Sequence, residues 1–365
     1  MILMNDFKAE PEALRMAELA AVERVLRSGW YVLGNEVKAF EAAWARQCGT
    51  ADCVGVGNGM DAIEIGLRAL GIGPEDEVIT TPMTAFATVL AIVRAGATPV
   101  LADIDARTAL LDPVSVERCI SPRTKAILLV HLYGQVHELG KWTDLSARHG
   151  IALLEDCAQS HLAQWNGRAG GSFGRFGAYS FYPTKNLGAL GDGGAIVMDD
   201  VILAQRAAVL RNYGQTVRYH HPELGLNSRL DELQAALLLV RMEWLEGFTE
   251  RRRQIAAAYY AGITNPSIQL LAAPIQARSH VYHLFVVLCE QRDQLAQHLK
   301  AQGVEALIHY PMPVHFQDPC KDVRRDPHGL RLAERHAAQC LSIPCHPQMS
   351  NSNVNHVIDA INAFK

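Results

Sequence analysis

The sequence predicts an α/β protein: a large, mostly parallel sheet with helices on both faces, followed by a smaller C-terminal α+β domain. Over the first two thirds of the chain, short apolar runs alternate with helical patterns, as in proteins built from strand–helix–strand units. These apolar runs are continuous, which indicates strands that are covered on both faces. The pattern then becomes mixed, so we expect a large domain over residues 1–247 and a small one over residues 248–365.

The expected elements follow in chain order. An amphipathic helix opens the chain at about residues 12–28. A long helix near residues 229–245 closes the large domain, and a second helix begins with the charged run at 250–253. The run at 281–287 alternates and predicts a strand of the small domain. The strands expected in the large domain are 54–56, 77–80, 98–101, 126–130, 151–154 and 178–182, with helices near 60–70, 85–95 and 142–148 between them.

Composition excludes several classes of protein. Of the 365 residues, 49% are hydrophobic and 20% are charged, which suffices for a large core. The net charge of −4 gives no electrostatic reason to expect nucleic acid or an anionic membrane as partner. Residues 1–6 lack the features of a signal peptide, and the longest low-polarity stretch, 85–93, is about half of a membrane crossing. The eight cysteines have no C-x-x-C spacing. We therefore expect a cytoplasmic protein with reduced thiols in its core and no metal site.

Polar residues gather after three of the expected strands. In open α/β sheets ligands bind beyond the carboxyl ends of the strands, so these clusters are the candidate site. The glycine-rich turn at 57–61 opens a helix, and its amides either bind a phosphate or form an ordinary turn. In the segment 155–161, Asp156 either caps a following helix or faces a cationic ring nitrogen. In the segment 180–188, Lys185 is either a solvated surface residue or an imine-forming amine.

These clusters, in this order, resemble the sugar aminotransferases of the DegT/DnrJ/EryC1/StrS family, which are fold type I enzymes that use pyridoxal phosphate. The resemblance extends over almost the whole chain. The segments that carry it are 28–34, 57–62, 130–135, 155–161, 180–194, 210–214, 225–234 and 309–311.

The resemblance implies a site built around Lys185 and Asp156. Lys185 matches the catalytic lysine that binds the cofactor covalently and moves a proton between cofactor and sugar. Asp156 matches the catalytic carboxylate that keeps the pyridine nitrogen protonated, so that the ring acts as an electron sink. The other implied cofactor contacts are Gly59, Met60, Asp61, Phe86, Gln159, Ser180 and, for the phosphate in the neighbouring subunit, Asn227. The implied substrate contacts are Tyr182, Arg229, His309 and Tyr310.

Two positions depart from the family pattern. Many relatives carry a threonine at the position of Met60, whose hydroxyl binds phosphate, so backbone amides must carry more of that role here. The aromatic residue that usually stacks on the pyridine ring is replaced by Ala85, and Phe86 follows one residue later, so the stacking group stays open. We expect His131 and His161 to be hydrogen-bonded structural residues.

The implied activity is the transfer of an amino group from an amino acid, with glutamate as the expected donor, to a nucleotide-linked keto-sugar. It implies a homodimer with shared active sites. The turn at 58–62, which contains Asp61, is more similar to members that act at C3 of the sugar than at C4. The open alternatives are a 4-keto substrate, a dehydratase, which would carry histidine in place of Lys185, and a non-catalytic cofactor-binding regulator. The usual destinations of such sugars are lipopolysaccharide O-antigen, capsule and glycosylated natural products. The nucleotide and the sugar stay open.

Overall fold

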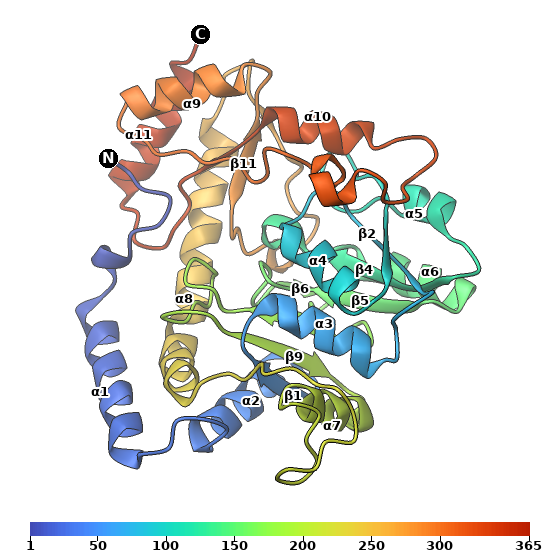
Figure 1. Ribbon diagram of the computed structural model, residues 1–365. Coiled ribbons are helices and arrows are strands. Elements are labelled where there is room, and N and C mark those ends of the chain that lie inside the picture. Colours follow the sequence, from blue (N-terminus) through green and yellow to red (C-terminus); the bar gives the residue numbers. More distant parts are fainter.

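A seven-stranded sheet forms the centre of the protein in the computed structural model, which describes residues 1–365 (Figure 1). β9 is antiparallel to both of its neighbours, β1 and β8, and all other neighbouring pairs are parallel. The predicted mostly parallel sheet is therefore confirmed. In the order of neighbours the strands are β1 (Asp52–Val56), β9 (Gly194–Met198), β8 (Gly177–Ser180), β5 (Ala152–Asp156), β4 (Thr124–Val130), β2 (Glu77–Thr80) and β3 (Thr98–Leu101).

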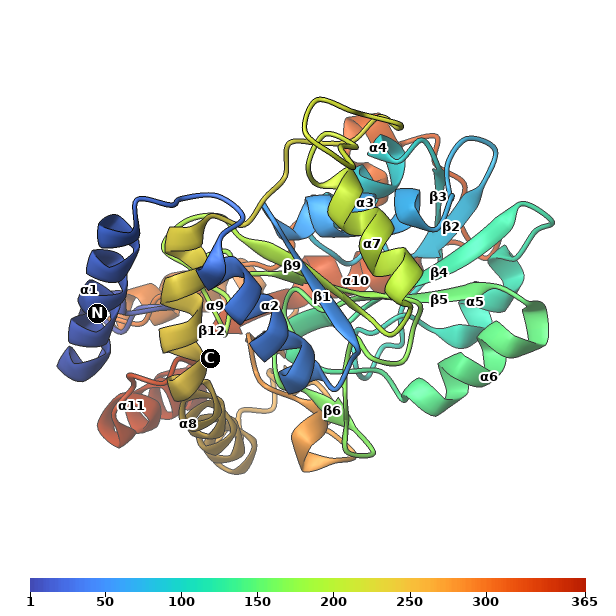
Figure 2. The same ribbon diagram turned by 90° about the horizontal axis from the view of Figure 1, so that it is seen from below.

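Helices cover both faces of this sheet (Figure 2). Along β4, Ala126 and Leu128 join an apolar cluster with the helices of one face. Ile127 and Leu129 point the other way and join a second cluster with helices of the opposite face. Both sides of the strand are thus buried, which is why its sequence is continuously apolar. One face carries α3 (Gly59–Ala69), α4 (Phe86–Arg94) and α7 (Val201–Leu210); the other carries α2 (Asn35–Cys48), α5 (Pro113–Cys119) and α6 (Leu139–His149).

One long helix, α8 (Glu232–Gly262), connects the large sheet to the C-terminal region. The prediction of two helices with a break near residue 248 is wrong. No proline interrupts the segment, and a single glycine, Gly247, is tolerated inside a helix. The N-terminal helix α1 (Glu12–Ser28) packs along α8. The predicted division at residues 247 and 248 falls inside α8 and stays a prediction.

The C-terminal residues form a second sheet of three antiparallel strands. The predicted strand at 281–287 is confirmed only from Phe285 onward. Residues 281–284 turn toward the large sheet instead, where the Val281 amide donates to the Gly134 carbonyl and the Leu284 amide to the Tyr133 carbonyl. The elements of this region are β10 (Gln269–Leu270), β11 (Phe285–Leu288), β12 (Cys340–Ile343), α9 (Arg292–Ala301), α10 (Arg331–Gln339) and α11 (Asn351–Asn362).

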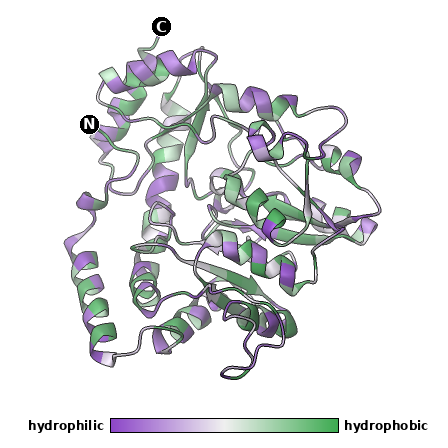
Figure 3. Ribbon diagram, viewed as in Figure 1, coloured by the Kyte–Doolittle hydropathy of each residue, from purple (hydrophilic) through white to green (hydrophobic).

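Other differences from the prediction are local. β8 ends at Ser180, two residues early, because the chain turns at Tyr182, whose carbonyl accepts from the Lys185 amide. The strand β9, the helices α2, α5 and α7, and a hairpin of β6 (Gln164–Trp165) and β7 (Arg168–Ala169) were not predicted. Figure 3 shows the apolar strands enclosed by helices that are polar on their outer sides. All eight cysteines are buried and free, as expected. No helix combines the length and the apolar character that a membrane crossing requires.

Candidate active site

The predicted site residues come together where β5 and β8 end and α3 begins. Asp156 is the last residue of β5, and Ser180 is the last residue of the neighbouring strand β8. Gly59 opens α3 directly against this edge: a Cβ on Gly59 would lie 2.6 Å from the Ser180 Cβ. Only glycine permits this approach, so the start of α3 and the Ser180 hydroxyl form one surface.

The start of α3 offers free hydrogen-bond donors. Asn58 caps the helix: its Oδ1 accepts from the Asp61 amide at 2.9 Å, and its carbonyl accepts from the Ala62 amide at 3.1 Å. The Gly59 and Met60 amides remain available, at the helix end where the dipole favours an anion. The Asp61 amide, also predicted to bind phosphate, is already used by the cap.

Asp156 is buried and held by two donors. Its Oδ2 accepts from the Thr88 hydroxyl at 2.8 Å, and its Oδ1 accepts from the Ala158 amide at 3.1 Å. No helix follows, so the alternative of a helix cap does not apply, and residues 157–160 form a turn. Burial raises the pKa of Asp156, while the two hydrogen bonds and the charge of Lys185 favour the ionised form. Sequence analysis missed Thr88 and Thr84, whose hydroxyls lie 2.7 Å apart.

Lys185 lies in the loop after β8 and interacts electrostatically with the Asp156 carboxylate. Burial lowers the pKa of Lys185 to about 8, and the Asp156 carboxylate opposes this shift. Two half-buried histidines face the same amine. Burial and the Lys185 charge lower the pKa of His309 to about 4 and that of His283 well below its ordinary value, so both rings are neutral at pH 7. The Nδ1 of His283 lies 3.3 Å from the Asn186 Oδ1, which ties this unpredicted residue to the lysine loop.

Gln159 is buried, and both ends of its side-chain amide are hydrogen-bonded. Its Oε1 accepts from the Tyr133 amide at 2.6 Å, and its Nε2 donates to the Tyr310 hydroxyl at 3.2 Å. Burial and the nearby Asp156 raise the pKa of Tyr310 to about 12. Tyr310 was predicted on the substrate side, and the structure places its hydroxyl against a predicted cofactor contact.

Known proteins share this architecture. The family model for the DegT/DnrJ/EryC1/StrS aminotransferase family matches residues 12–362. This chain belongs to that family. A dTDP-3-amino-3,4,6-trideoxy-alpha-D-glucose transaminase of Streptomyces venezuelae is 46% identical over 360 residues, which cover 98% of this chain and 94% of the relative. A dTDP-3-amino-3,6-dideoxy-alpha-D-galactopyranose transaminase of Aneurinibacillus thermoaerophilus is 44% identical and covers 94% of both chains. The crystal structure of S. venezuelae DesV in complex with a ketimine intermediate superposes with a TM-score of 0.95 at 44% identity, covering 99% of this chain and 97% of that one.

Three predicted site residues of this family member are exposed in the single chain, and a fourth, Arg229, is half-buried. The side chains of Tyr182 and Phe86 are 52% and 37% exposed, and Asn227 is exposed too. Arg229 donates to the Asn212 Oδ1 at 3.1 Å and lies over a neighbouring tyrosine ring. None of the four contacts Asp156 or Lys185 through a hydrogen bond, so their predicted roles, like the stacking role of Phe86, stay predictions.

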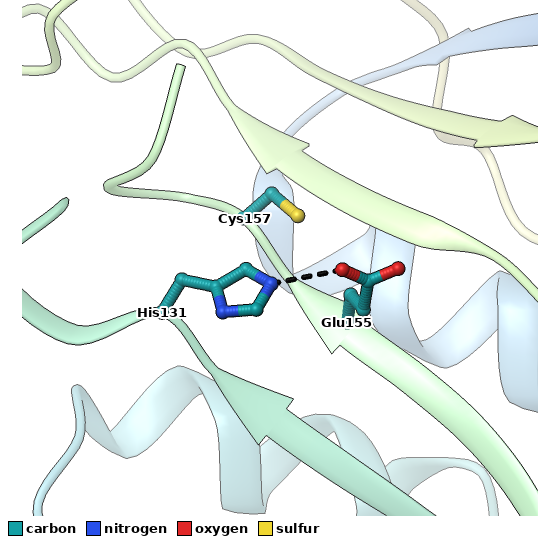
Figure 4. Close-up of side chains that lie close together, drawn as sticks. All are labelled: His131, Glu155 and Cys157. Atoms are coloured by element: carbon teal, nitrogen blue, oxygen red, sulfur yellow. Dashed lines mark hydrogen bonds and ion pairs between the residues drawn. The ribbon is translucent and has the colours of Figure 1, made fainter. Parts of the chain in front are cut away.

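A second cluster of ionisable side chains consists of His131, Glu155 and Cys157 (Figure 4). The ligand atoms of His131, Glu155 and Cys157 lie within 4.8 Å of one another. The Glu155 carboxylate accepts from the His131 Nε2 at 2.9 Å and from three backbone amides at 2.7–2.8 Å. Burial favours its protonated form, but these donors hold its pKa below the ordinary value. With its lone pairs occupied in this way, Glu155 anchors the loop at 171–174.

The two histidines expected to be structural differ from one another. His131 is hydrogen-bonded on both sides, because its Nδ1 also lies 3.1 Å from the His137 Nδ1. His161 is buried, but neither of its ring nitrogens has a hydrogen-bond partner, so the expectation of a hydrogen-bonded residue is wrong. It packs among the aromatic rings of Trp44, Tyr179 and Phe181, and burial lowers its pKa to about 3.

Proposed function

We propose that this chain is a pyridoxal-phosphate-dependent aminotransferase that moves an amino group from L-glutamate to a nucleotide-linked keto-sugar, with the keto group at C3. The observation that carries the proposal is the pairing of a desolvated lysine, Lys185, with a buried carboxylate, Asp156, beside the free amides of α3. A desolvated lysine next to a strand-end carboxylate is suited to bonding a carbonyl carbon.

The donor set fits each part of pyridoxal phosphate. A phosphate at a helix start is bound by several hydrogen-bond donors and does not require a charged side chain. The available donors here are the Gly59 and Met60 amides and the Ser180 hydroxyl. The buried Asp156 carboxylate at the end of β5 suits a protonated ring nitrogen. The Gln159 Nε2 is a donor for the ring oxygen. When bound, the cofactor supplies an electron sink that allows a carbon–nitrogen bond to be exchanged.

The chain's own residues set the protonation needed at each position. With a pKa of about 8, Lys185 has a substantial neutral fraction at neutral pH, and a neutral amine is the form that attacks a carbonyl carbon and accepts a proton. Asp156 acts in its ionised form, which Thr88 and the Ala158 amide support. His283 and His309 stay neutral, so neither competes with Lys185 for negative charge.

We further propose a homodimer with shared active sites. Exposed apolar side chains surround the start of α8, where the Glu232 amide donates to the Tyr31 carbonyl and the Leu190 amide to the Gln234 Oε1. Asn227 is exposed in the segment that leads into this helix, as a contact to a partner's cofactor would require. An apolar surface of this kind is normally covered by another chain. The exposed side chains are Trp30 (63%), Tyr31 (53%), Leu190 (57%) and Tyr213 (44%).

We place the reaction in the cytoplasm, because buried, free thiols are typical of a reducing compartment. The amino sugar would then enter lipopolysaccharide O-antigen, capsule or a natural product.

The position of the keto group is tested with a panel of acceptors. The purified holoenzyme is incubated with glutamate and dTDP- or UDP-linked 3-keto and 4-keto sugars, and amino-sugar products are measured by mass spectrometry. The names of the two relatives above, both 3-amino-sugar transaminases, support faster conversion of the 3-keto acceptors. Conversion of 4-keto sugars alone would overturn the C3 assignment, and no amino sugar from any acceptor would overturn the function.

A further inference from the structure

We propose that Tyr133 is a positioning residue that fixes Gln159, on the cofactor side of the site, relative to the segment 309–310 on the substrate side. It does so through its backbone amide and its hydroxyl, respectively. The inference rests on the proposed function of Gln159, His309 and Tyr310. Tyr133 lies in the segment 130–135, which carries part of the family resemblance but to which sequence analysis gave no role.

The backbone at Tyr133 is held in an unusual conformation. Tyr133 has a φ of 60° and Gly134 a φ of 96°. A bulky residue in the left-handed region is strained and persists only where its surroundings hold it. A Cβ on Gly134 would lie 2.9 Å from the Gln159 carbonyl oxygen and 3.0 Å from the His283 amide nitrogen. The turn is therefore clamped between the segment after β5 and the segment before β11.

The amide of Tyr133 fixes which end of Gln159 faces the site. It donates to the Gln159 Oε1 at 2.6 Å. A backbone N–H cannot pair with the amide nitrogen of glutamine, so this bond sets the orientation of the side chain. The Nε2 must then point the other way, where it donates to the Tyr310 hydroxyl at 3.2 Å.

The hydroxyl of Tyr133 anchors the segment that carries His309 and Tyr310. It donates to the His309 carbonyl oxygen at 2.6 Å and lies 2.9 Å from the His336 Nε2. Because its one proton goes to the carbonyl, His336 must be the donor and carry its hydrogen on Nε2. Burial lowers the pKa of His336 to about 4, so the ring is the neutral tautomer that this bond requires. The Ser342 hydroxyl holds the His309 ring from the other side, at 2.9 Å from Nδ1.

A mutation separates the hydrogen bonds of the hydroxyl from that of the amide. Tyr133→Phe removes the hydroxyl and keeps the amide bond to Gln159. The segment at 309–310 then loses its anchor while the cofactor contact is retained. We expect the KM for the keto-sugar to rise about tenfold, the factor that corresponds to one buried hydrogen bond, with kcat within about threefold of wild type. The dissociation constant for pyridoxal phosphate should stay within about twofold of the wild-type value.

Tyr259→Phe is the matched control. Tyr259 is fully buried and its hydroxyl also donates to a backbone carbonyl, that of Pro344, at 2.6 Å, but it has no bond to the 309–310 segment. Both variants lose a buried hydroxyl and its bond to a backbone carbonyl. Tyr133→Phe also leaves the His336 Nε2–H without its acceptor, so its Tm should fall at least as far as that of Tyr259→Phe. Only Tyr133→Phe should raise the KM for the sugar. Equal KM values in the two variants would overturn the proposal.

A second pair of variants changes His336, which donates to the Tyr133 hydroxyl. This pair tests the proposal if Tyr133→Phe does not fold. His336→Gln retains an N–H donor, whereas His336→Leu leaves the Tyr133 hydroxyl without one. We expect the leucine variant to raise the KM for the sugar and the glutamine variant to restore it. An equal rise in both would overturn the proposal. All values are read relative to wild type, so a wild-type protein inactive on every keto-sugar would count against the proposed function instead.

Discussion

Pulse acetylation of the apoprotein should show that Lys185 loses its proton near pH 8. An ordinary lysine titrates near pH 10.5, and burial lowers the pKa of Lys185 to about 8. At pH 7 about a tenth of a group with a pKa of 8 is neutral, against about one part in 3,000 for an ordinary lysine. The structure therefore raises the concentration of the reactive amine by roughly 300-fold, which is the advantage that an imine-forming lysine needs.

The assay compares two lysines within one sample. The apoprotein is pulsed with acetic anhydride between pH 6 and pH 11, and acetylation of Lys185 is measured by mass spectrometry against the exposed Lys125 as reference for reagent dose. Partial burial slows the reagent at every pH, so it lowers the plateau of the Lys185 curve but leaves its midpoint unchanged.

The Asp156→Asn variant gives the sign of the coupling. The Asp156 carboxylate raises the pKa of Lys185 against the effect of burial, so its removal should move the midpoint below pH 8. A wild-type midpoint near pH 10.5 would refute the desolvation of Lys185. An upward shift in Asp156→Asn would refute the coupling between the two residues.

Three other changes probe the remaining parts of the site. Asp156→Asn should keep the cofactor but lose about two orders of magnitude or more in kcat, and a kcat near wild type would contradict the role of Asp156. Thr88→Val removes a donor to Asp156, so the pKa of this carboxyl should rise further. Because activity needs the ionised form, the variant should lose activity on acidification at a higher pH than wild type does. Thr88→Ser retains the donor and should restore the wild-type acid limb of the pH profile. In a mixed dimer of Lys185→Ala and Asn227→Asp chains, one site keeps both native residues if Asn227 serves its partner, so about a quarter of wild-type activity should return on random mixing. A verified heterodimer without activity would place Asn227 in its own chain.

Much of the fold could be predicted because burial on both faces leaves a plain signal in the sequence. The strands of the large sheet appear as continuous apolar runs, and β2 and β3 were predicted with the bounds they have. The break near residue 248 was predicted because the sequence pattern changes after residue 245 and the charged run at 250–253 follows. In the structure Arg252 is buried inside α8, where it donates to backbone carbonyls of Tyr282, His283 and Cys345. Such a partner set depends on tertiary contacts that no local pattern contains.

In the site, too, residues with a local sequence signal could be predicted, and residues defined by tertiary contacts could not. Asp156 could be predicted because it follows an apolar strand of a parallel sheet, where ligands bind. Ser180 lay inside the expected strand 178–182, and its role came from the family resemblance. Thr88 and Tyr133 could not be predicted, since their partners Asp156 and His309 lie 68 and 176 residues further along the chain. The only available signal was that Tyr133 lies in the segment 130–135, which carries part of the family resemblance.

Chemical trapping of the cofactor tests the central claim most directly. The protein is loaded with pyridoxal phosphate, reduced with borohydride, digested, and mapped by mass spectrometry. We expect the cofactor mass on the peptide that contains Lys185, and no covalent cofactor in Lys185→Ala. Cofactor fixed to another lysine while Lys185 stays unmodified would contradict the placement of the active site at the ends of β5 and β8.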